Sequence, residues 1–294
     1  VANTCAAMSP AIGSSGSATC SFDGFVAGDA GDPNHLDTVT ATVADDESNV
    51  VTDDGSATVT FTDALPVVGV TKSPSVASVE EPGAVVTFTL VVSNASAEVV
   101  TVASLVDDVF GDLLDGGNPA VSANICASLP ATLGVGAALS CSFDGFVAGN
   151  GDDPDHVNTV TFSAFDDEGT TASDQASATV AFNDAAPDAT LTKDASAGTV
   201  TEPGDTVTFT VTIDNDGPEP LDIAALDDSV FGDLLDAGNT AVSANTCLSL
   251  PAQVAAGGWV ACWFDADLVG LAGDPDHVDT VTATLRDDEG TTIT

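Results

Sequence analysis

Apolar and polar residues alternate with a period of two along most of this chain. The clearest run has four apolar residues separated by threonines, at Val207, Phe209, Val211 and Ile213. A similar run extends over residues 86–92. A period of two over this length predicts β-strands with one face toward a core, and no stretch shows a helical period.

Residues 67–187 contain about seven such runs, separated by turn residues such as those of Glu80-Glu81-Pro82-Gly83. The residues expected to face the core in the first and the later strands are Val68, Val70, Leu139, Cys141, Phe143, Val157, Val160, Phe162, Ala164, Ala178, Val180 and Phe182. The predicted fold class is all-β, built from Greek-key β-sandwiches of immunoglobulin type.

The pattern recurs at an interval of 121 residues. Three sets of residues keep this spacing: Cys5, Cys126 and Cys247; Cys20, Cys141 and Cys262; and His35, His156 and His277. A unit of this length can bury its own core, unlike a short solenoid repeat. We divide the chain into an N-terminal segment (1–66), expected to be the second half of one copy, a middle segment (67–187), expected to be a complete copy, and a C-terminal segment (188–294), expected to lack only the last strand.

The charge of the chain excludes several partners. It has 46 acidic and 3 basic residues, for a formal net charge of −43. Nucleic acid and anionic membrane surfaces repel such a chain, and no run is long enough to insert into a membrane. Carboxylates at this density need cations, which come either from a salty medium around a solvated acidic surface or from bound divalent ions.

The cysteines form three pairs, each with 14 residues between its members. A disulfide is predicted within each copy, and each loop closure contributes about 3 kcal/mol. Zinc would need more ligands at a different spacing. The predicted disulfides are Cys5–Cys20, Cys126–Cys141 and Cys247–Cys262, which indicates an extracellular or periplasmic setting.

Acidic residues lie at the predicted ends of the sandwiches. Head-to-tail stacking would bring acidic loops of adjacent segments together, where they repel unless a cation joins them. We therefore expect Ca²⁺ at or near the segment junctions. The candidate ligands are Glu81, Asp107, Asp108 and Asp184, with Glu202, Asp227 and Asp228 in the C-terminal segment, and a second candidate site comprises Asp166, Asp167, Glu168 and Asp174. The alternative is that these residues form turns through local backbone hydrogen bonds.

A catalytic role is not expected. Each histidine lies in an Asp-Pro-Asn/Asp-His stretch just before a strand, where a loop hydrogen bond is the expected role. No nucleophile recurs beside the histidines, and no phosphate-binding loop or HExxH motif occurs.

Two tryptophans interrupt the repetition. Trp259 and Trp263 occur only in the C-terminal segment and share the outward face of one predicted strand. Two exposed tryptophans on one sheet face would form a contact surface, with a glycan as one candidate partner. The alternative is that neighbouring loops cover them.

Several motifs in a constant order carry a resemblance: EPG…VTFTV, LDDSVFGDLL, GDPDHVDTVTAT and DDEGTT, with paired cysteines between them. This order resembles the Ig-like tandem repeats of large bacterial and archaeal cell-surface proteins, which implies an extracellular or cell-surface location. A fainter likeness to cadherin repeats lies in residues 183–187, which resemble their calcium-binding linker.

Three roles remain after these observations. The first is a structural building block of an extracellular filament, stalk or surface layer that self-associates into a fibre or longer tandem array. The second is an adhesin or carbohydrate-binding module with the repeats as spacers. The third is a set of accessory domains of an enzyme whose catalytic part lies outside this sequence.

Overall fold

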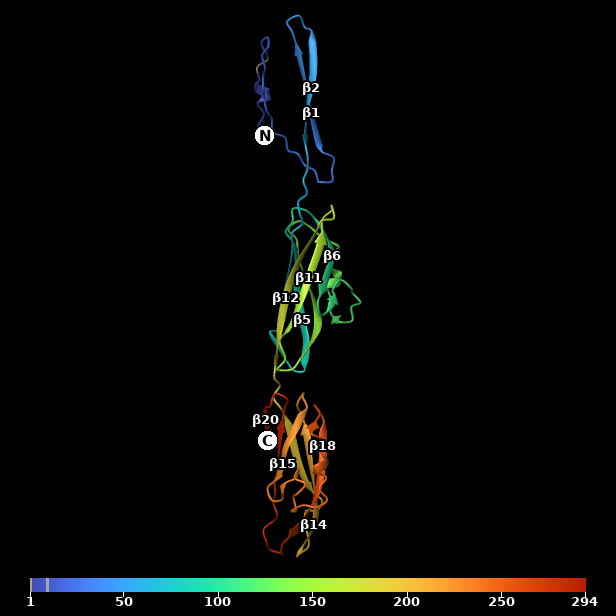
Figure 1. Ribbon diagram of the computed structural model, residues 1–294, viewed down its shortest axis with the longest axis vertical. Coiled ribbons are helices and arrows are strands. Elements are labelled where there is room, and N and C mark those ends of the chain that lie inside the picture. Colours follow the sequence, from blue (N-terminus) through green and yellow to red (C-terminus); the bar gives the residue numbers. More distant parts are fainter. Residues whose placement is uncertain (1, 9–10) are drawn as a thin grey trace.

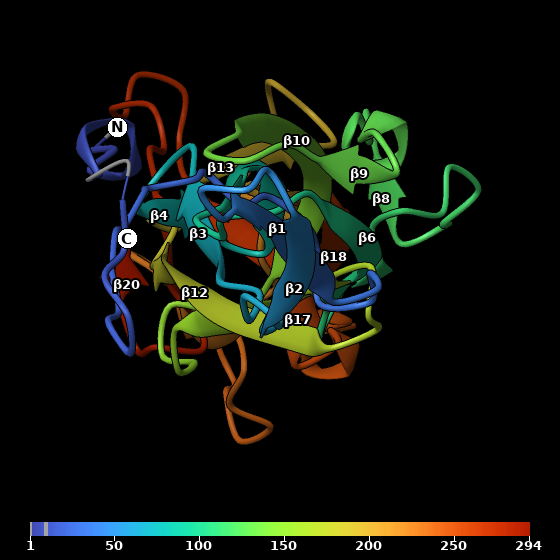
Figure 2. The same cartoon turned by 90° about the horizontal axis from the view of Figure 1, so that it is seen from above.

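The computed structural model describes residues 2–8 and 11–294, which form an all-β molecule. The three helices among the described residues are short 3-10 turns: η1 (Cys5–Ala7), η2 (Cys126–Ser128) and η3 (Cys247–Ser249). Figure 1 shows the three segments in line along the longest axis, and Figure 2 views this rod from above. Within the described part, no helix has both the length and the apolar character needed to cross a membrane.

The middle segment consists of two sheets. The first has the order β3 (Val68–Pro74), β5 (Gly83–Asn94), β10 (Ala138–Ala148) and β8 (Val121–Ser122). The second has the order β4 (Ser78–Glu80), β12 (Thr171–Asn183), β11 (His156–Phe165), β6 (Val100–Asp107) and β7 (Gly111–Asp112), and β9 (Thr132–Leu133) pairs with β6. All pairs are antiparallel except β4 with β12. Both sheets contribute to one apolar core, as in a β-sandwich.

The predicted alternation is confirmed in β5, where Val86, Phe88, Leu90 and Val92 are all fully buried. In β11 one prediction is wrong. Val157 is 55% exposed, and the inward position beside it belongs to Asn158, which is fully buried. Since side chains alternate along a strand, Asn158 shares the inward face with Val160 and Phe162.

The C-terminal segment has its own core. One sheet contains β13 (Ala189–Ala195), β14 (Gly204–Asn215) and β18 (Trp259–Val269). The other contains β16 (Gly232–Asp233), β15 (Leu221–Asp228), β19 (Val281–Arg286) and β20 (Thr292–Ile293), with β17 (Gln253–Val254) paired to β15.

The N-terminal segment contains one antiparallel pair, β1 (His35–Ala44) and β2 (Val50–Val59). Every residue of both strands is exposed, so this hairpin buries no core of its own among the described residues.

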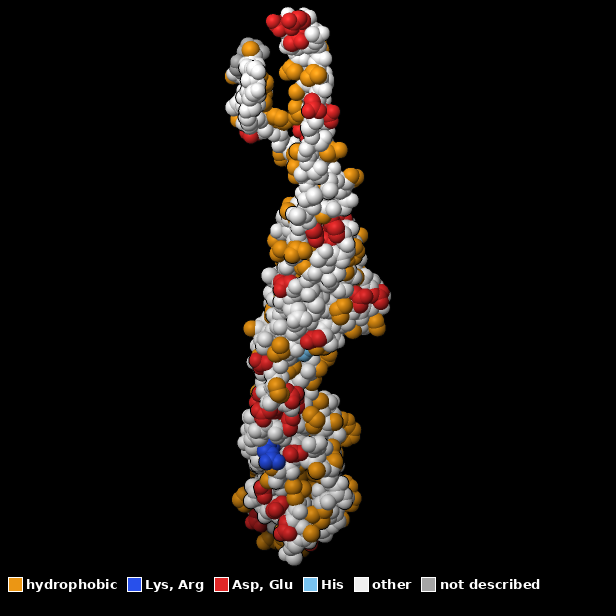
Figure 3. Space-filling model, turned by 45° about the horizontal axis from the view of Figure 1, so that its top comes forward, with side chains coloured by type: hydrophobic (Ala, Val, Ile, Leu, Met, Phe, Trp, Pro, Cys, Tyr) orange, Lys and Arg blue, Asp and Glu red, His pale blue; other side chains and the backbone are white. Residues whose placement is uncertain are grey.

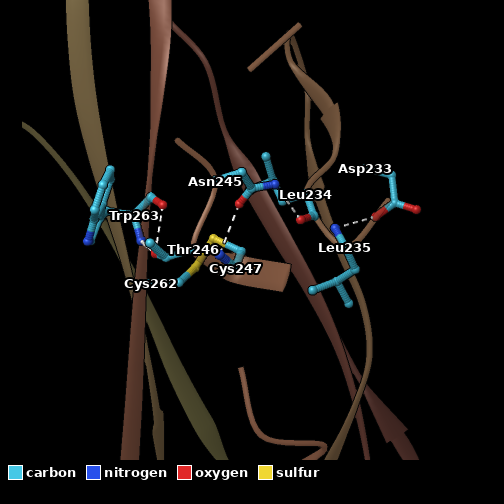
Figure 4. Close-up of a disulfide and its surroundings, with 8 residues drawn as sticks. All are labelled: Asp233, Leu234, Leu235, Asn245, Thr246, Cys247, Cys262 and Trp263. Carbon is cyan, nitrogen blue, oxygen red and sulfur yellow. Dashed lines mark hydrogen bonds between the residues drawn. A yellow bond between two sulfur atoms is a disulfide. The ribbon is translucent and has the colours of Figure 1, made fainter. Parts of the chain in front are cut away.

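The three predicted disulfides are present. Cys5–Cys20, Cys126–Cys141 and Cys247–Cys262 each join residues 15 positions apart. Figure 4 shows how Cys262 of β18 reaches Cys247 of η3, while the ring of Trp263 points away from the bridge. Cys126–Cys141 ties η2 to β10, and Cys247–Cys262 ties η3 to β18. Such disulfides are typical of extracellular proteins.

Candidate metal sites at the segment junctions

Carboxylates from two segments converge where the middle and C-terminal segments meet. Glu81 precedes β5 and Asp184 follows β12, while Glu219 lies between β14 and β15 and Glu289 between β19 and β20. One ligand atom from each of the four lies within 4.8 Å of the others. We call this group the C-terminal junction cluster.

The backbone holds Glu81 in place. Its Oε2 accepts a hydrogen bond from the Gly151 N–H at 2.6 Å, and its Oε1 accepts one from the Ala185 N–H at 2.6 Å. Glu81 is 3% exposed. Its carboxylate is therefore oriented by its own segment before any ion binds.

A second cluster lies where the N-terminal and middle segments meet. Oxygen atoms of Asp29, Glu98, Asp167 and Glu168 lie within 4.8 Å of one another, and Asp63, Asp166 and Glu168 form an overlapping group. We call these residues the N-terminal junction cluster. Figure 3 shows acidic side chains gathered at the two narrow zones between the segments.

The two junctions use equivalent positions. Asp63, Glu98 and Glu168 of the first junction are each followed 121 residues later by Asp184, Glu219 and Glu289 of the second. Asp166 and Asp167 have Asp287 and Asp288 as counterparts, and Asn150 stands at the position of Asp29. Packing of successive segments thus places the same acidic side chains together twice.

Several junction oxygens are buried without a hydrogen-bond partner among the described residues. These are Asp63 Oδ1, Glu98 Oε2 and Asp166 Oδ2 at the first junction, and Glu219 Oε2, Asp287 Oδ2 and Glu289 Oε2 at the second. Asp166 and Asp287 are each only 2% exposed. A buried, unpartnered carboxylate oxygen is costly, so it requires an explanation such as a bound ion.

The basic residues of the chain are paired with other groups. Lys72 contacts Asp107, Lys193 contacts Asp228 and Asp279, and Arg286 contacts Asp222. These are the only Lys and Arg residues in the sequence. No basic side chain is left to neutralise either junction.

The pKa values reflect this concentration of negative charge. Desolvation, with the neighbouring Glu81 carboxyl, raises the pKa of Glu219 to about 8. Desolvation and nearby carboxylates raise the pKa of Glu168 and of Glu289 to about 7. The pKa values of Glu98 and Asp184 are raised for the same reasons.

The geometry is suited to a hard divalent cation. Calcium binds oxygen ligands at about 2.3–2.6 Å, so two ligands of one ion lie at most about 5 Å apart. The oxygens of each cluster lie within 4.8 Å of one another, so one ion could contact them together.

The structure separates the predicted ligands into different environments. Glu81 and Asp184 lie in the C-terminal junction cluster, and Asp166, Asp167 and Glu168 in the N-terminal one. Asp107 and Asp228 instead face the cores, where they contact Lys72 and Lys193.

The remaining predicted ligands lie outside both junction clusters. Asp108 is exposed and accepts a bond from the Thr159 N–H at 2.7 Å, and Asp174 Oδ2 accepts one from Val70 N–H at 2.9 Å. Glu202 accepts a bond from the Ala272 N–H at 2.7 Å, and Asp227 is exposed on β15.

Sequence reasoning missed six residues of the two junctions: Asp29, Asp63, Glu98, Glu219, Asp287 and Glu289. A signal was present, because Glu98 and Glu219 are glutamates at equivalent positions in a turn, 121 residues apart.

The tryptophans are exposed. Trp259 is 68% and Trp263 is 42% exposed, so the alternative that loops of this chain cover them is wrong. Their partners across the sheet are Asp214 and Thr210.

No protein-family model matches the chain, and no curated protein matches it in sequence. Among solved structures, it is similar to a protein of unknown function from Porphyromonas gingivalis W83, at 16% identity and a TM-score of 0.29, covering 68% of this chain and 83% of that one.

It is also similar to the E. coli chaperone DraB, at 12% identity and a TM-score of 0.24 over 78% and 94% of the two chains. Another similar structure is that of the protocadherin gamma B7 extracellular cadherin domains 1–4, at 10% identity and a TM-score of 0.23 over 89% and 65%. Likenesses at these TM-scores carry no weight for function.

Proposed function

We propose that the chain is a structural building block of an extracellular filament, stalk or surface layer. In this proposal, Ig-like Greek-key sandwiches follow one another at a 121-residue interval. Disulfides stiffen each sandwich, and Ca²⁺ stiffens each junction. The chain self-associates into a fibre or a longer tandem array at the surface of a bacterium or archaeon.

The recurrence of the junction clusters is the observation that carries this proposal. Two junctions place acidic residues at equivalent positions around buried, unpartnered oxygens, at Asp166 in one and Asp287 in the other. Without a cation these carboxylates repel, and the segments would move independently. With Ca²⁺ bound, both junctions become rigid, which suits a protein that transmits or resists force.

The ligand set proposed here differs from the one expected from sequence. It comprises Asp63, Glu98, Asp166 and Glu168 at the N-terminal junction, and Asp184, Glu219, Asp287 and Glu289 with Glu81 at the C-terminal junction.

Small-angle X-ray scattering tests the proposal. The chain should have a larger maximum dimension and a narrower size distribution in Ca²⁺ than in chelator. The double variant Asp166→Asn/Asp287→Asn should lose this response. Asp112→Asn/Asp233→Asn is the matched control, because these aspartates are exposed, lie outside both clusters and have the same spacing. A scattering profile unaffected by Ca²⁺ would reject the stiffening role.

A second candidate function is glycan binding by the C-terminal segment. The exposure of Trp259 and Trp263 on one face of β18 favours it, because aromatic planes beside Asp214 and Thr210 can stack on a sugar while polar groups donate and accept hydrogen bonds.

A further inference from the structure

A charged group lies inside the core of the middle segment. Lys72 of β3 contacts Asp107 at the end of β6, and both side chains are fully buried. The Lys72 Nζ also lies 3.3 Å from the backbone oxygen of Asn158 in β11. Asn158 Nδ2 lies 3.2 and 3.1 Å from the two carboxylate oxygens of Asp107. Asp107 therefore touches both the amine and the carboxamide.

The C-terminal segment repeats this arrangement with one change. Lys193 of β13 lies 2.5 Å from Asp228 Oδ2 and also contacts Asp279. Asp279 stands 121 residues after Asn158, so an aspartate replaces the asparagine. The two lysines of the whole chain thus occupy the same place in two cores.

Aromatic rings surround each amine. The Lys72 Nζ lies 4.9 Å from the ring centroid of Phe88 and 5.8 Å from that of Phe143. The Lys193 Nζ lies 4.3 Å from the ring centroid of Phe209 and 5.5 Å from that of Phe264. Burial among these rings lowers the pKa of Lys72, opposed by its contact with Asp107. A neutral amine is a nucleophile, and desolvation favours that form.

The carbonyl oxygen of Asn158 is buried without a hydrogen-bond partner among the described residues. The side-chain oxygen and nitrogen of an asparagine are distinguished by the groups that they hydrogen-bond. Turning the amide would direct this oxygen at Asp107, which in its protonated form can donate to it. That bond would polarise the carboxamide carbon.

We propose that Lys72 and Asn158, and likewise Lys193 and Asp279, react within the folded chain to form isopeptide cross-links, with Asp107 and Asp228 as the proton-transferring residues. Each reaction joins a side-chain nitrogen to a side-chain carbonyl carbon and needs no cofactor, oxidant or second protein.

The first reaction joins Lys72 to Asn158 with loss of ammonia. Lys72 gives its ammonium proton to Asp107, and the neutral Nζ attacks Cγ of Asn158. The Nζ–Cγ bond forms and the Cγ–Nδ2 bond breaks. Asp107 then gives its proton to the departing nitrogen, which leaves as ammonia, and takes up the second amine proton in its place, while the third hydrogen stays in the new amide.

In the second reaction the neutral Nζ of Lys193 attacks Cγ of protonated Asp279. Asp228 transfers the proton in the same way, and water leaves instead of ammonia. No atom changes oxidation state in either reaction, because an amide replaces an amide in one case and a carboxylic acid in the other.

The positions of the residues give the cross-link a mechanical consequence. β3 belongs to one sheet of the middle segment, while β11 belongs to the other. A Lys72–Asn158 bond would therefore join the two sheets covalently. The two residues are 86 positions apart in the sequence. The cross-links require neither filament assembly nor Ca²⁺, so their presence or absence is independent of the proposed function.

Intact-mass spectrometry of the denatured, unreduced chain is the decisive measurement. The expected mass is that of the disulfide-bonded sequence less one ammonia and one water. Fragmentation should locate the losses in peptides joining Lys72 to Asn158 and Lys193 to Asp279. The full mass of the disulfide-bonded sequence would overturn the proposal, and so would losses located elsewhere.

Trypsin offers a second readout, because it cleaves after free lysine. The denatured, reduced chain should be cut after Arg286 but resist cleavage after Lys72 and Lys193, the other two basic positions. Cleavage after both lysines would contradict the cross-links.

Variants separate the two reactions. Lys72→Met should abolish the ammonia loss and keep the water loss, and Lys193→Met should do the reverse. Asp107→Asn retains both reacting groups and should also abolish the ammonia loss, as expected if Asp107 transfers the proton. An unchanged ammonia loss in Asp107→Asn would show that Asp107 does not transfer the proton. The mass of the unmodified chain is measured separately, so a variant that fails to fold does not affect the main test.

Discussion

Asn215 donates a hydrogen bond from Nδ2 to the backbone oxygen of Glu219 at 2.6 Å, so a buried amide positions a junction carboxylate. The same nitrogen donates to the Val254 oxygen at 3.1 Å. The Asn215 Oδ1 accepts a bond from the Gly217 N–H at 3.0 Å. Asn94 makes the corresponding contact with Glu98 at 2.7 Å. One side chain thus links the turn that carries the glutamate to the interior of the sandwich.

Replacing this amide should destabilise the C-terminal segment. Asn215→Ala leaves buried backbone groups without partners, each at a cost of about 1–3 kcal/mol, so we expect a loss of at least about 3 kcal/mol. Tryptophan fluorescence during urea unfolding reports on this segment, since Trp259 and Trp263 are the only tryptophans. Asn94→Ala is the matched control and should leave that transition unchanged. An unaltered midpoint in Asn215→Ala would contradict the role assigned to the amide.

The junctions should depend on pH in the absence of divalent ions. A carboxyl whose pKa is raised by folding binds more protons in the closed junction than in the open one, so stability falls as the pH rises between the two values. The pKa of Glu219 rises to about 8 and that of Glu289 to about 7, from an ordinary value of 4.5. In chelator we therefore expect a compact, rigid C-terminal junction near pH 5 that loosens progressively toward pH 8.

Scattering at several pH values checks this dependence. Glu219→Gln/Glu289→Gln should remain rigid in chelator at every pH, because glutamine resembles the protonated acid. Added Ca²⁺ should restore rigidity at pH 8 in the unmodified chain and release protons. A junction in chelator whose rigidity is constant from pH 5 to pH 8 would argue against the charge repulsion inferred here.

The disulfide of each segment should stabilise that segment alone. Cys247 and Cys262 close a loop with a sequence separation of 15, for which chain-entropy reasoning gives about 3 kcal/mol. Cys247→Ala/Cys262→Ala should lower the unfolding free energy of the C-terminal segment by that amount, measured by tryptophan fluorescence. Cys126→Ala/Cys141→Ala provides the comparison, and equal shifts of the tryptophan transition in both double variants would show that the cores are not independent.

The tryptophan face can be tested with neutral polysaccharides, because the net charge of −43 disfavours acidic ones. If this face binds glycans, affinity electrophoresis should show retardation of the chain and its loss in Trp259→Ser/Trp263→Ser. The middle segment has Ala138 and Ser142 at these positions. Ala138→Trp/Ser142→Trp should then create a second binding face on the middle segment. If the chain is still retarded after Trp259→Ser/Trp263→Ser, the native tryptophan face is not the binding site.

Local pattern predicted the strands and the disulfides well. The alternation of residues 86–92 predicted β5, and the spacing of Cys126 and Cys141 predicted their bridge. Both features depend on neighbours close in sequence, which the pattern describes directly.

The polar core groups were overlooked although their parity was visible. Lys72 follows Val68 and Val70 on the inward face of β3, and Asn158 precedes Val160 on that of β11. Val157 was predicted to face the core because it is apolar. The β-period itself points to Asn158, because residues two apart share a face.

By itself, the sequence determined the all-β class, the interval of 121 residues, the cysteine pairs and the presence of acidic residues at the strand ends. Only the tertiary structure decided what each acidic residue contacts. Asp107 and Glu81 lie at the same end of the sandwich, yet Asp107 turns inward to Lys72 while Glu81 faces the next segment. The physical reason is that loop direction and the stacking of segments bring together groups as distant in sequence as Glu81 and Glu289. Strand periodicity contains no information about loop direction or about stacking.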